Sequence, residues 1–236
     1  ENKKLFTKNK ITLIMPNKKF IENTFDKFLF FQNYKSYFPL LDTFKTLNDL
    51  KVFHNGIFPF PIIAKERYGS ASVGIKIITN INELKFFDEN NTSYIFQKYI
   101  DKVEFGVDVF FDILNSDLID FFIKEKISMR AGETDKSISI WNDEVIKIVL
   151  KLNTIKGLRG AIDVDIFYDK DNGEYYINEI NPRFGGGYNH AHYSGCNFVK
   201  YIVNNMLGKS NKAQNFPLYK KDLIMMKYNA FTFLKG

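Results

Sequence analysis

Three oxygen-bearing side chains, Asp165, Glu179 and Asn181, lie in the stretch whose residue types are best suited to chemistry. The runs 161–168 and 174–180 alternate apolar and polar residues and are joined by Asp-Lys-Asp-Asn-Gly, which predicts a β-hairpin. Because alternate side chains of a strand share a face, this hairpin can bring the three oxygen donors together. Such donors suit Mg²⁺ or Mn²⁺ carrying a nucleotide phosphate.

The residues that follow the hairpin weaken a purely structural explanation. Each acidic side chain or glycine, taken alone, suits an ordinary soluble hairpin, but Gly185, Gly186 and Gly187 provide more backbone freedom than a two-residue turn needs. Arg183 lies just before them, in a chain that relies on lysine for most of its positive charge. A planar guanidinium can bind a carboxylate or phosphate through two hydrogen bonds at once, which favours a binding role.

The run Glu-Ile-Asn-Pro-Arg-Phe-Gly-Gly-Gly, with an aspartate on the preceding strand, resembles the ATP-grasp superfamily. The resemblance is nearest to the large subunit of carbamoyl-phosphate synthetase and related carboxylate–amine ligases. It implies an α+β fold in which two lobes with antiparallel sheets enclose ATP. The implied domains are residues 1–42, the end of an N-terminal region with a linker helix; residues 43–100, a small lobe with a phosphate loop; and residues 101–236, a large lobe with the metal site.

A lysine followed by a loop of small residues forms a second candidate site. Residues 61–65 read as a strand that ends in Lys65, and the loop 66–74 contains Gly-Ser-Ala-Ser-Val-Gly. Small residues let backbone N–H groups approach a phosphate closely, although most such loops are ordinary turns. The loop matches neither the Walker pattern nor a dinucleotide fingerprint. It resembles the phosphate-covering loop of the ATP-grasp fold, which implies that its nucleotide-binding residues are Gly69, Ser70, Ser72 and Gly74.

The resemblance also assigns contacts outside this loop. By itself Lys27 reads as a solvated lysine on a helix, and Glu104 as a strand-edge charge that discourages aggregation. Lys126 and Arg130 could equally be surface charges. The family pattern instead implies phosphate contacts by Lys27 and Lys65, adenine contacts by Gln97, Lys98 and Ile100, a ribose contact by Glu104, metal binding by Asp165, Glu179 and Asn181, and catalytic roles for Lys126, Arg130 and Arg183.

Hydrophobic periodicity and capping residues predict the elements that must position these groups. Besides the central hairpin, the expected strands are 11–15, 61–65, 75–79, 94–99, 107–114, 118–127 and 222–234. The expected helices are 80–90, 141–156, 197–207 and one that begins after Asn17 with an apolar stripe of Phe20 or Ile21, Phe25, Phe28 and Phe31.

Composition limits the partners. Hydrophobic residues make up 45% and charged residues 25% of the chain, as in an ordinary soluble globular protein. The net charge is +6, but the lysines are scattered among acidic residues, which argues against nucleic acid. No apolar run is long enough to span a membrane, and the first residues lack a signal-peptide pattern. The single cysteine excludes an internal disulfide and predicts a reducing, cytoplasmic location.

Two histidines near the glycines leave a zinc site open as an alternative. His190 and His192 lie two residues apart, and the only further nitrogen or sulfur ligand at a suitable spacing is Cys196. Cys196 is equally suited to be a small buried residue. The closeness of His190 to Arg183 in the sequence also allows a contact with the acceptor substrate.

The resemblance implies ATP-dependent ligation. A small-molecule carboxylate would attack the γ-phosphate to give an acyl phosphate, and an amine, such as that of an amino acid, would displace phosphate to form an amide, releasing ADP and phosphate. Two other interpretations stay open: an ATP-grasp module that binds ATP without catalysis, and an ATP-grasp phosphotransferase that stops after phosphorylation. The chain could also form a homodimer. Related ligases carry a domain before the strand expected at 11–15, and it helps to form the acceptor site. Either the chain is a fragment of a longer enzyme, or another chain completes the acceptor site.

Overall fold

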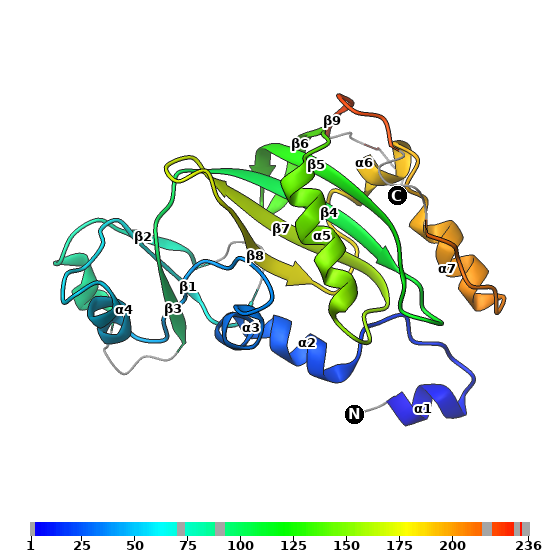
Figure 1. Cartoon of the computed structure of the whole chain (residues 1–236), viewed down its shortest axis with the longest axis horizontal. Coiled ribbons are helices and arrows are strands. Elements are labelled where there is room, and N and C mark those ends of the chain that lie inside the picture. Colours follow the sequence, from blue (N-terminus) through cyan, green and yellow to red (C-terminus); the bar gives the residue numbers. More distant parts are fainter. Residues whose placement is uncertain (1–2, 70–73, 88–92, 214–218, 229–231, 233–236) are drawn as a thin grey trace.

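Two antiparallel sheets organise the chain (Figure 1). The computed structural model describes all residues except 1–2, 70–73, 88–92, 214–218, 229–231 and 233–236. The strand order is β2-β1-β3 in the three-stranded sheet and β8-β7-β4-β5-β6-β9 in the six-stranded sheet. Helices accompany both sheets, so the expected α+β class is confirmed.

The bounds of the elements are as follows. The three-stranded sheet contains β1 (Ile62–Glu66), β2 (Lys76–Ile78) and β3 (Tyr94–Lys98). The six-stranded sheet contains β4 (Lys102–Phe111), β5 (Leu118–Arg130), β6 (Glu133–Ser139), β7 (Gly160–Asp169), β8 (Tyr175–Asn181) and β9 (Ile224–Met226). The helices are α1 (Lys3–Lys8), α2 (Lys18–Phe25), α3 (Lys27–Tyr34), α4 (Leu47–Phe53), α5 (Asp143–Lys151), α6 (Tyr188–Tyr193) and α7 (Phe198–Met206), with 3₁₀ turns η1 (Glu83–Phe86) and η2 (Leu152–Thr154).

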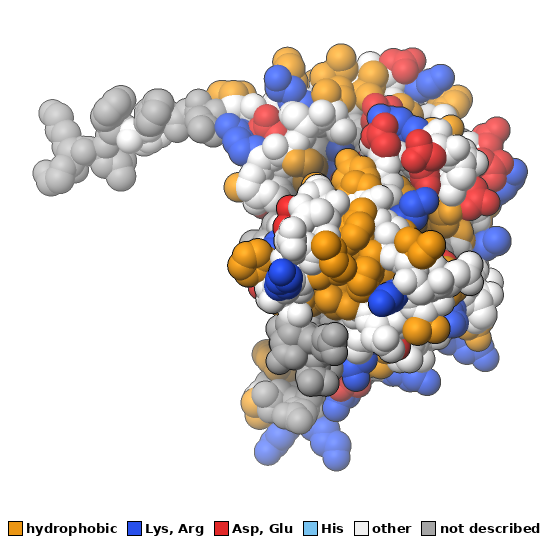
Figure 2. Space-filling model, turned by 90° about the vertical axis from the view of Figure 1, so that its left-hand side faces the viewer, with side chains coloured by type: hydrophobic (Ala, Val, Ile, Leu, Met, Phe, Trp, Pro, Cys, Tyr) orange, Lys and Arg blue, Asp and Glu red, His pale blue; other side chains and the backbone are white. Residues whose placement is uncertain are grey.

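The three-stranded sheet, α4 and η1 share a hydrophobic cluster of their own, and we call them the small lobe. Leu50 of α4 and Ile62 and Ala64 of β1 are completely buried in this cluster. Because side chains alternate along β1, the intervening Ile63 and Lys65 face the other way, towards the six-stranded sheet. Figure 2 views this end of the molecule, where hydrophobic side chains gather near the centre of the face with lysines and arginines around them.

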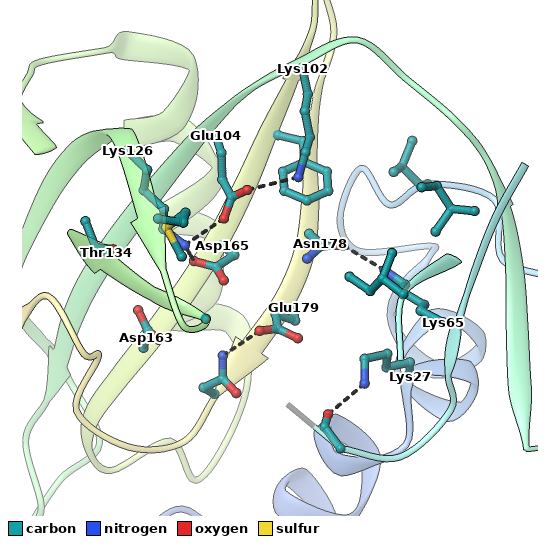
Figure 3. Close-up of a pocket in the computed structure, with 18 of the residues that line it drawn as sticks. Lys27, Lys65, Lys102, Glu104, Lys126, Thr134, Asp163, Asp165, Asn178 and Glu179 are labelled. Carbon is teal, nitrogen blue, oxygen red and sulfur yellow. Dashed lines mark hydrogen bonds and ion pairs between the residues drawn. The ribbon is translucent and has the colours of Figure 1, made fainter. Parts of the chain in front are cut away.

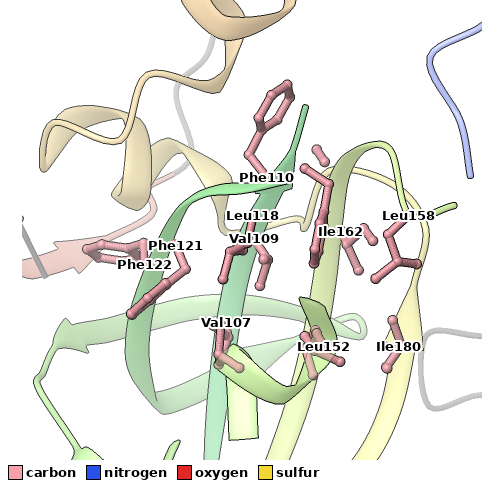
Figure 4. Close-up of a cluster of buried hydrophobic side chains, with 14 of the residues drawn as sticks. Val107, Val109, Phe110, Leu118, Phe121, Phe122, Leu152, Leu158, Ile162 and Ile180 are labelled. Carbon is pink, nitrogen blue, oxygen red and sulfur yellow. The ribbon is translucent and has the colours of Figure 1, made fainter. Parts of the chain in front are cut away.

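The six-stranded sheet, which with its helices we call the large lobe, has one face that is polar at the cavity and apolar where Phe110 packs against Phe198 of α7. Its other face is apolar. Val107 and Val109 of β4 are register partners of Val164 and Ile162 of β7, and all four are buried in the cluster that also contains Leu152 (Figure 4). Helix α5 crosses the sheet on this side (Figure 1).

On the opposite face the same strands present charged residues. Asp108 of β4 lies opposite Asp163 of β7, and Gly106 lies opposite Asp165. Across the other edge of β4, Lys124 of β5 is the partner of Gly106. The period of two along each strand therefore gathers carboxylates and a lysine on one side of the sheet.

The N-terminal expectations are only partly met. The expected strand at 11–15 is wrong: neither sheet pairs with this run, and Ile11, Ile14 and Met15 are 52, 38 and 44% exposed. Asn17 does cap a helix, with its side chain accepting a hydrogen bond from the Phe20 amide. That helix ends at Asp26, whose carboxylate caps α3, so the single expected helix is two short ones.

Other elements are shorter than expected or were not predicted. The expected helix 80–90 is reduced to η1 among the described residues, and the expected strand 222–234 to β9. The expected helix 141–156 is α5 followed by η2. Strand β6 and helix α6 were not predicted, because Glu-Thr-Asp-Lys-Ser-Ile-Ser has few apolar residues and α6 is only six residues long.

The buried carboxyl group of Asp120 allows a test of how the stability of the fold depends on pH. It accepts hydrogen bonds from the Tyr201 hydroxyl at 2.9 Å and the Phe121 amide at 2.8 Å, with the Cys196 thiol 3.8 Å away. Burial raises the pKa of Asp120 to about 6, although the hydrogen bonds from Tyr201 and Phe121 oppose the shift. Because the folded pKa exceeds the ordinary value of 3.8, the folded chain holds this proton more tightly than the unfolded chain.

The protonated carboxyl group of Asp120 therefore stabilises the folded chain at low pH. We expect this contribution, about 3 kcal/mol of the free energy of unfolding, to be lost as the pH rises from about 4 through about 6. Asp120→Asn should remove this loss and raise the free energy of unfolding at pH 7 relative to the wild type. Urea denaturation at pH 4, 5, 6 and 7 measures the difference, and Asp117→Asn, at an exposed position, is the control. An unchanged pH dependence in Asp120→Asn would contradict the expectation.

Candidate active site

A cavity of about 620 Å³ lies between the small lobe and the polar face of the large lobe (Figure 3). One end is apolar, and Ile75 and Ile77, which line it, are 45 and 53% exposed. Exposed isoleucines inside a cavity suit a flat apolar group such as a nucleotide base. The aliphatic and phenylalanine side chains of the lining are Leu41, Ile63, Ile75, Ile77, Ile100, Met129, Phe167 and Phe184.

Two lysines project into the cavity from the small-lobe side (Figure 3). Lys65, at the end of β1, is 8% exposed and donates to Asn178 Oδ1 at 2.9 Å. Lys27, the first residue of α3, donates to the Gly69 carbonyl at 2.7 Å. Burial lowers the pKa of Lys65 to about 8; Glu179 opposes this shift and the charge of Lys27 adds to it. Because the charges of Lys27 and Lys65 both line the cavity, they favour binding of an anionic ligand between the lobes.

Asp26 and Arg67 fix the position of Lys27. Arg67 Nε and Nη2 donate to the two carboxylate oxygens of Asp26 at 2.8 and 2.6 Å, and the Lys27 amide donates to the Arg67 carbonyl at 3.1 Å. Burial acts to raise the pKa of Asp26, but hydrogen bonds from Arg67 and from backbone amides of α3 outweigh it and lower that pKa. The ion pair between Asp26 and Arg67 connects the N-terminus of α3 to the segment that follows β1.

Carboxylates form the centre of the cavity (Figure 3). Asp165 and Glu179 are direct partners across β7 and β8, and Asn181 Nδ2 donates to Glu179 Oε1 at 3.1 Å. Lys126 Nζ lies 2.6 Å from Asp165 Oδ1 and 2.8 Å from Glu104 Oε1. Burial raises the pKa of Asp165 to about 7, with Lys126 acting against the shift and the neighbouring carboxylates adding to it.

The centre fits a hard divalent cation. Asp165, Glu179 and Asn181 supply oxygen donors from adjacent strands, and the negative charge around Asp165 is larger than Lys126 alone neutralises. In the part of the chain that the structure describes, however, no three His, Cys, Asp or Glu side chains already form a group that could hold a metal. The metal-binding role of Asp165, Glu179 and Asn181 therefore stays a prediction.

Gly106 makes room for the lysines of this face. A Cβ atom at Gly106 would lie 3.0 Å from Lys126 Cε and 3.1 Å from Lys124 Cε. These distances are tighter than ordinary van der Waals contact, so a larger residue would push both lysines away from their carboxylates. The sequence analysis did not single out Gly106, although a glycine inside an apolar strand often marks a close approach.

The far end of the cavity, beyond the central carboxylates, contains Arg183, which the sequence analysis assigned to the site, and neighbouring charges that it missed. Lys124 and Asp108 form an ion pair with side chains 1 and 2% exposed. Arg183 Nη1 lies 3.3 Å from Asp163 Oδ2 and 2.9 Å from the Phe184 carbonyl. Lys124 and Asp163 line the cavity with Arg183.

A sequence profile of the ATP-grasp domain matches residues 25–187. The chain belongs to the ATP-grasp family. A search of curated proteins gave no match.

Solved ATP-grasp structures share the fold. The biotin carboxylase domain of 2-oxoglutarate carboxylase from Hydrogenobacter thermophilus, in complex with MgADP, ADP and bicarbonate, is 19% identical with a TM-score of 0.69 over 89% of this chain and 51% of that chain. N5-carboxyaminoimidazole synthetase from Staphylococcus aureus, complexed with ADP, is 21% identical with a TM-score of 0.70 over 87% of this chain and 57% of that one.

D-Alanine-D-alanine ligase from Helicobacter pylori is 20% identical with a TM-score of 0.61, over 85% of this chain and 66% of that chain. The chain thus spans about half the length of the carboxylase domain, at 51%, and little more of the synthetase, at 57%. The structural similarity shows that the chain shares the ATP-grasp fold. Sequence identities of 19 to 21% do not show which reaction it catalyses. Among the described residues of the ATP-grasp domain, no helix has the length and apolar character to cross a membrane.

Most residues that the family resemblance assigns to the site line this one cavity. They are Lys27, Lys65, Gly69, Gln97, Lys98, Ile100, Glu104, Lys126, Asp165, Glu179, Asn181 and Arg183. Arg130 does not line it, and its guanidinium pairs with Asp135 at 2.7 Å. Gly74 packs beside Glu66 outside the lining, and Ser70 and Ser72 lie outside the described residues.

His190, His192 and Cys196, which follow the matched ATP-grasp region, have separate environments. His190 is 2% exposed and its Nδ1 lies 2.8 Å from the Ser137 hydroxyl, whereas His192 is exposed and lies 3.3 Å from the Tyr188 hydroxyl. Cys196 is buried beside Asp120. Since the described residues hold no metal-binding group of His, Cys, Asp or Glu, the zinc interpretation has no support there.

Proposed function

We propose that this ATP-grasp domain is the catalytic part of an ATP-dependent carboxylate–amine ligase, an enzyme that forms an amide through an acyl phosphate and releases ADP and phosphate. One observation carries the proposal. A single cavity is lined by apolar side chains, two lysines, oxygen donors on adjacent strands, and an arginine. In Figure 3 Lys27 and Lys65 lie on one side of Asp165 and Glu179, and Asp163 lies on the other, which suits a phosphate chain that runs past a metal towards an acceptor.

The nucleotide would lie with its base at the apolar end. The carbonyl of Lys98 and the N–H of Ile100 would read the adenine edge, with Gln97 beside them, because all three residues line that end. Glu104 accepts hydrogen bonds from Lys126 and from Lys102, at 2.8 and 2.9 Å, and would also accept from the ribose hydroxyls.

Lys27 and Lys65 would hold the phosphates. Asp165, Glu179 and Asn181 would hold Mg²⁺ or Mn²⁺, which supplies charge neutralisation at the phosphate oxygens when bound. Lys126 lies between Asp165 and Glu104, so its charge is placed to offset the charge of the transferring phosphoryl group. Placed charges of this kind commonly supply most of the acceleration in phosphoryl transfer.

The second half of the reaction would take place beside Arg183. The carboxylate oxygen bonds to the γ-phosphorus, the bond from phosphorus to the ADP oxygen breaks, and ADP leaves. A neutral amine nitrogen then bonds to the acyl carbon, the bond from carbon to the phosphate oxygen breaks, and the nitrogen loses one proton as phosphate leaves. Arg183, which lines the cavity next to the central carboxylates, would neutralise the phosphate in both steps. Enclosure between two lobes would limit hydrolysis of the acyl phosphate by water.

Phosphate release by the full-length protein tests the proposal. ATP and Mg²⁺ are supplied with pooled amino acids and other small carboxylates, with and without added amines. A ligase requires both a carboxylate and an amine for sustained release of ADP and phosphate. A stable phosphorylated product that forms without an amine would instead indicate a phosphotransferase, and ADP binding without turnover under any pairing would indicate a binding module.

A further inference from the structure

The far end of the cavity contains a carboxylate that neither the nucleotide nor the proposed metal requires. Asp163 lines the cavity, and its side chain is 13% exposed. In Figure 3 Asp163 lies to one side of Asp165 and Glu179, whereas Lys27 and Lys65 lie to the other side. A group bound at Asp163 would therefore approach the reacting phosphate from the side opposite the nucleotide.

Asp163 shares three nearby cations, Lys124, Lys126 and Arg183, with other carboxylates, and among the described residues only Arg183 bonds to it directly. Its register partner Asp108 is already paired with the buried Lys124. Arg183 Nη1 approaches Asp163 only to 3.3 Å and shares that nitrogen with the Phe184 carbonyl at 2.9 Å. Within the described part of the chain, no other donor bonds to Asp163. A largely buried carboxylate with spare acceptor capacity is costly unless a cation or donor completes it.

The backbone packs directly on this carboxylate, which fixes its position. A Cβ atom at Gly185 would lie 2.6 Å from Asp163 Oδ1 and 3.0 Å from Asp108 Oδ1. A Cβ atom at Gly187 would lie 2.9 Å from Lys124 Cε. Only glycine lets the chain pass this close, so the run of glycines after Arg183 holds the carboxylates of the far end in place. The carboxylate of Asp163 is thus held in one position, unlike a mobile side chain on the surface.

We propose that Asp163 binds the ammonium group of the amine substrate. The bound group gives one proton to water before attack, because only the neutral nitrogen has the lone pair that bonds to the acyl carbon. The acceptor is then a primary amine that is positively charged at neutral pH, either an amino acid or a simple alkylamine. This inference rests on the proposed ligase function. An ammonium ion supplies the charge and the donors that Asp163 lacks, whereas a second carboxylate would be repelled and an uncharged amine would gain less. Arg183 lies beside Asp163 and is placed to bind the phosphate that the amine displaces.

Hydroxylamine separates binding of an ammonium group from formation of the acyl phosphate. It is uncharged at neutral pH and reacts with acyl phosphates to give hydroxamates, so it has no need of an ammonium site. The full-length protein is supplied with ATP, Mg²⁺ and pooled small carboxylates that carry no amino group, and the added nucleophile is ethylamine, an amino acid or hydroxylamine. For Asp163→Asn, which keeps the shape and one oxygen, we expect the KM of the charged amines to rise about 30-fold or more. Hydroxamate formation should stay within about twofold of the wild type, because it uses no charged amine.

Further variants keep the inference falsifiable. Asp163→Glu retains the charge and should recover part of the lost amine affinity. Glu144→Gln, at an exposed residue of α5, should leave every rate unchanged. Binding of Mn²⁺, followed by electron paramagnetic resonance, should be unaltered in Asp163→Asn.

Three results would overturn the inference: an unchanged KM for amines in Asp163→Asn, an equal loss of hydroxamate and amide, or a loss of Mn²⁺ affinity, which would make Asp163 a metal ligand. A wild-type protein that gives neither hydroxamate nor amine-dependent phosphate would overturn the ligase function itself. Turnover with ethylamine or with amino acids alone identifies the source of the ammonium group, and either result supports the role of Asp163.

Discussion

Replacement of Glu179 by Gln should lower the rate of ADP formation about 100-fold or more while leaving the fold intact. Glu179 faces Asp165 across the hairpin and accepts from Asn181, so it lies at the centre of the proposed metal donors. Gln has the same shape but removes the negative charge that would hold the cation. Loss of one placed charge or donor at a phosphoryl-transfer site commonly costs two to three orders of magnitude.

Two measurements check this expectation. Steady-state ADP formation gives the rate, and electron paramagnetic resonance of Mn²⁺ gives the metal affinity, which should fall in Glu179→Gln. Glu174→Gln is a matched control, because Glu174 is exposed at the turn end of the same hairpin. If Glu179→Gln kept both the rate and the Mn²⁺ affinity of the wild type, the metal role of Glu179 would be excluded.

The central hairpin could be predicted from the sequence because its signals are local. The alternation along 161–168 and 174–180 and the intervening turn residues fix both the strands and their approximate pairing. Asp165 and Glu179 therefore face each other as expected. The run 11–15 carries an equally apolar signal, yet it is exposed, because a strand also needs a neighbour and the sequence does not reveal which strands have one.

The far end of the cavity could not be predicted in the same way. Asp108 and Lys124 each interrupt a long apolar strand, which is a signal for a buried polar site, but neither residue reveals its partner. Their pairing depends on the register between β4 and β5, and the position of Asp163 beside them depends on the register between β4 and β7. For Arg130 the sequence led to a site that the structure does not show. The family motif assigned Arg130 to the active site, yet in this chain its guanidinium pairs with Asp135 outside the cavity.

Replacement of Lys65 by Met should weaken ATP binding about 30-fold at pH 7 and remove a pH dependence of binding. In the ligand-free chain, burial lowers the pKa of Lys65 to about 8, so half of the amine has lost its proton at that pH. A bound phosphate favours the charged form and raises that pKa again. ATP binding by the wild type should therefore take up protons above about pH 8 and weaken as the pH rises, whereas near pH 6.5 Lys65 is already charged and contributes no uptake.

Calorimetric titration with ATP, in buffers of different ionisation enthalpy between pH 6.5 and 9, measures both affinity and proton uptake. In Lys65→Met the uptake near pH 8.5 should disappear together with the ionic contact. Lys76→Met tests for a general effect of charge, since Lys76 is exposed on β2 and does not line the cavity. Proton uptake that persists in Lys65→Met would assign the titration to another group, and an unchanged affinity would place the phosphates away from β1.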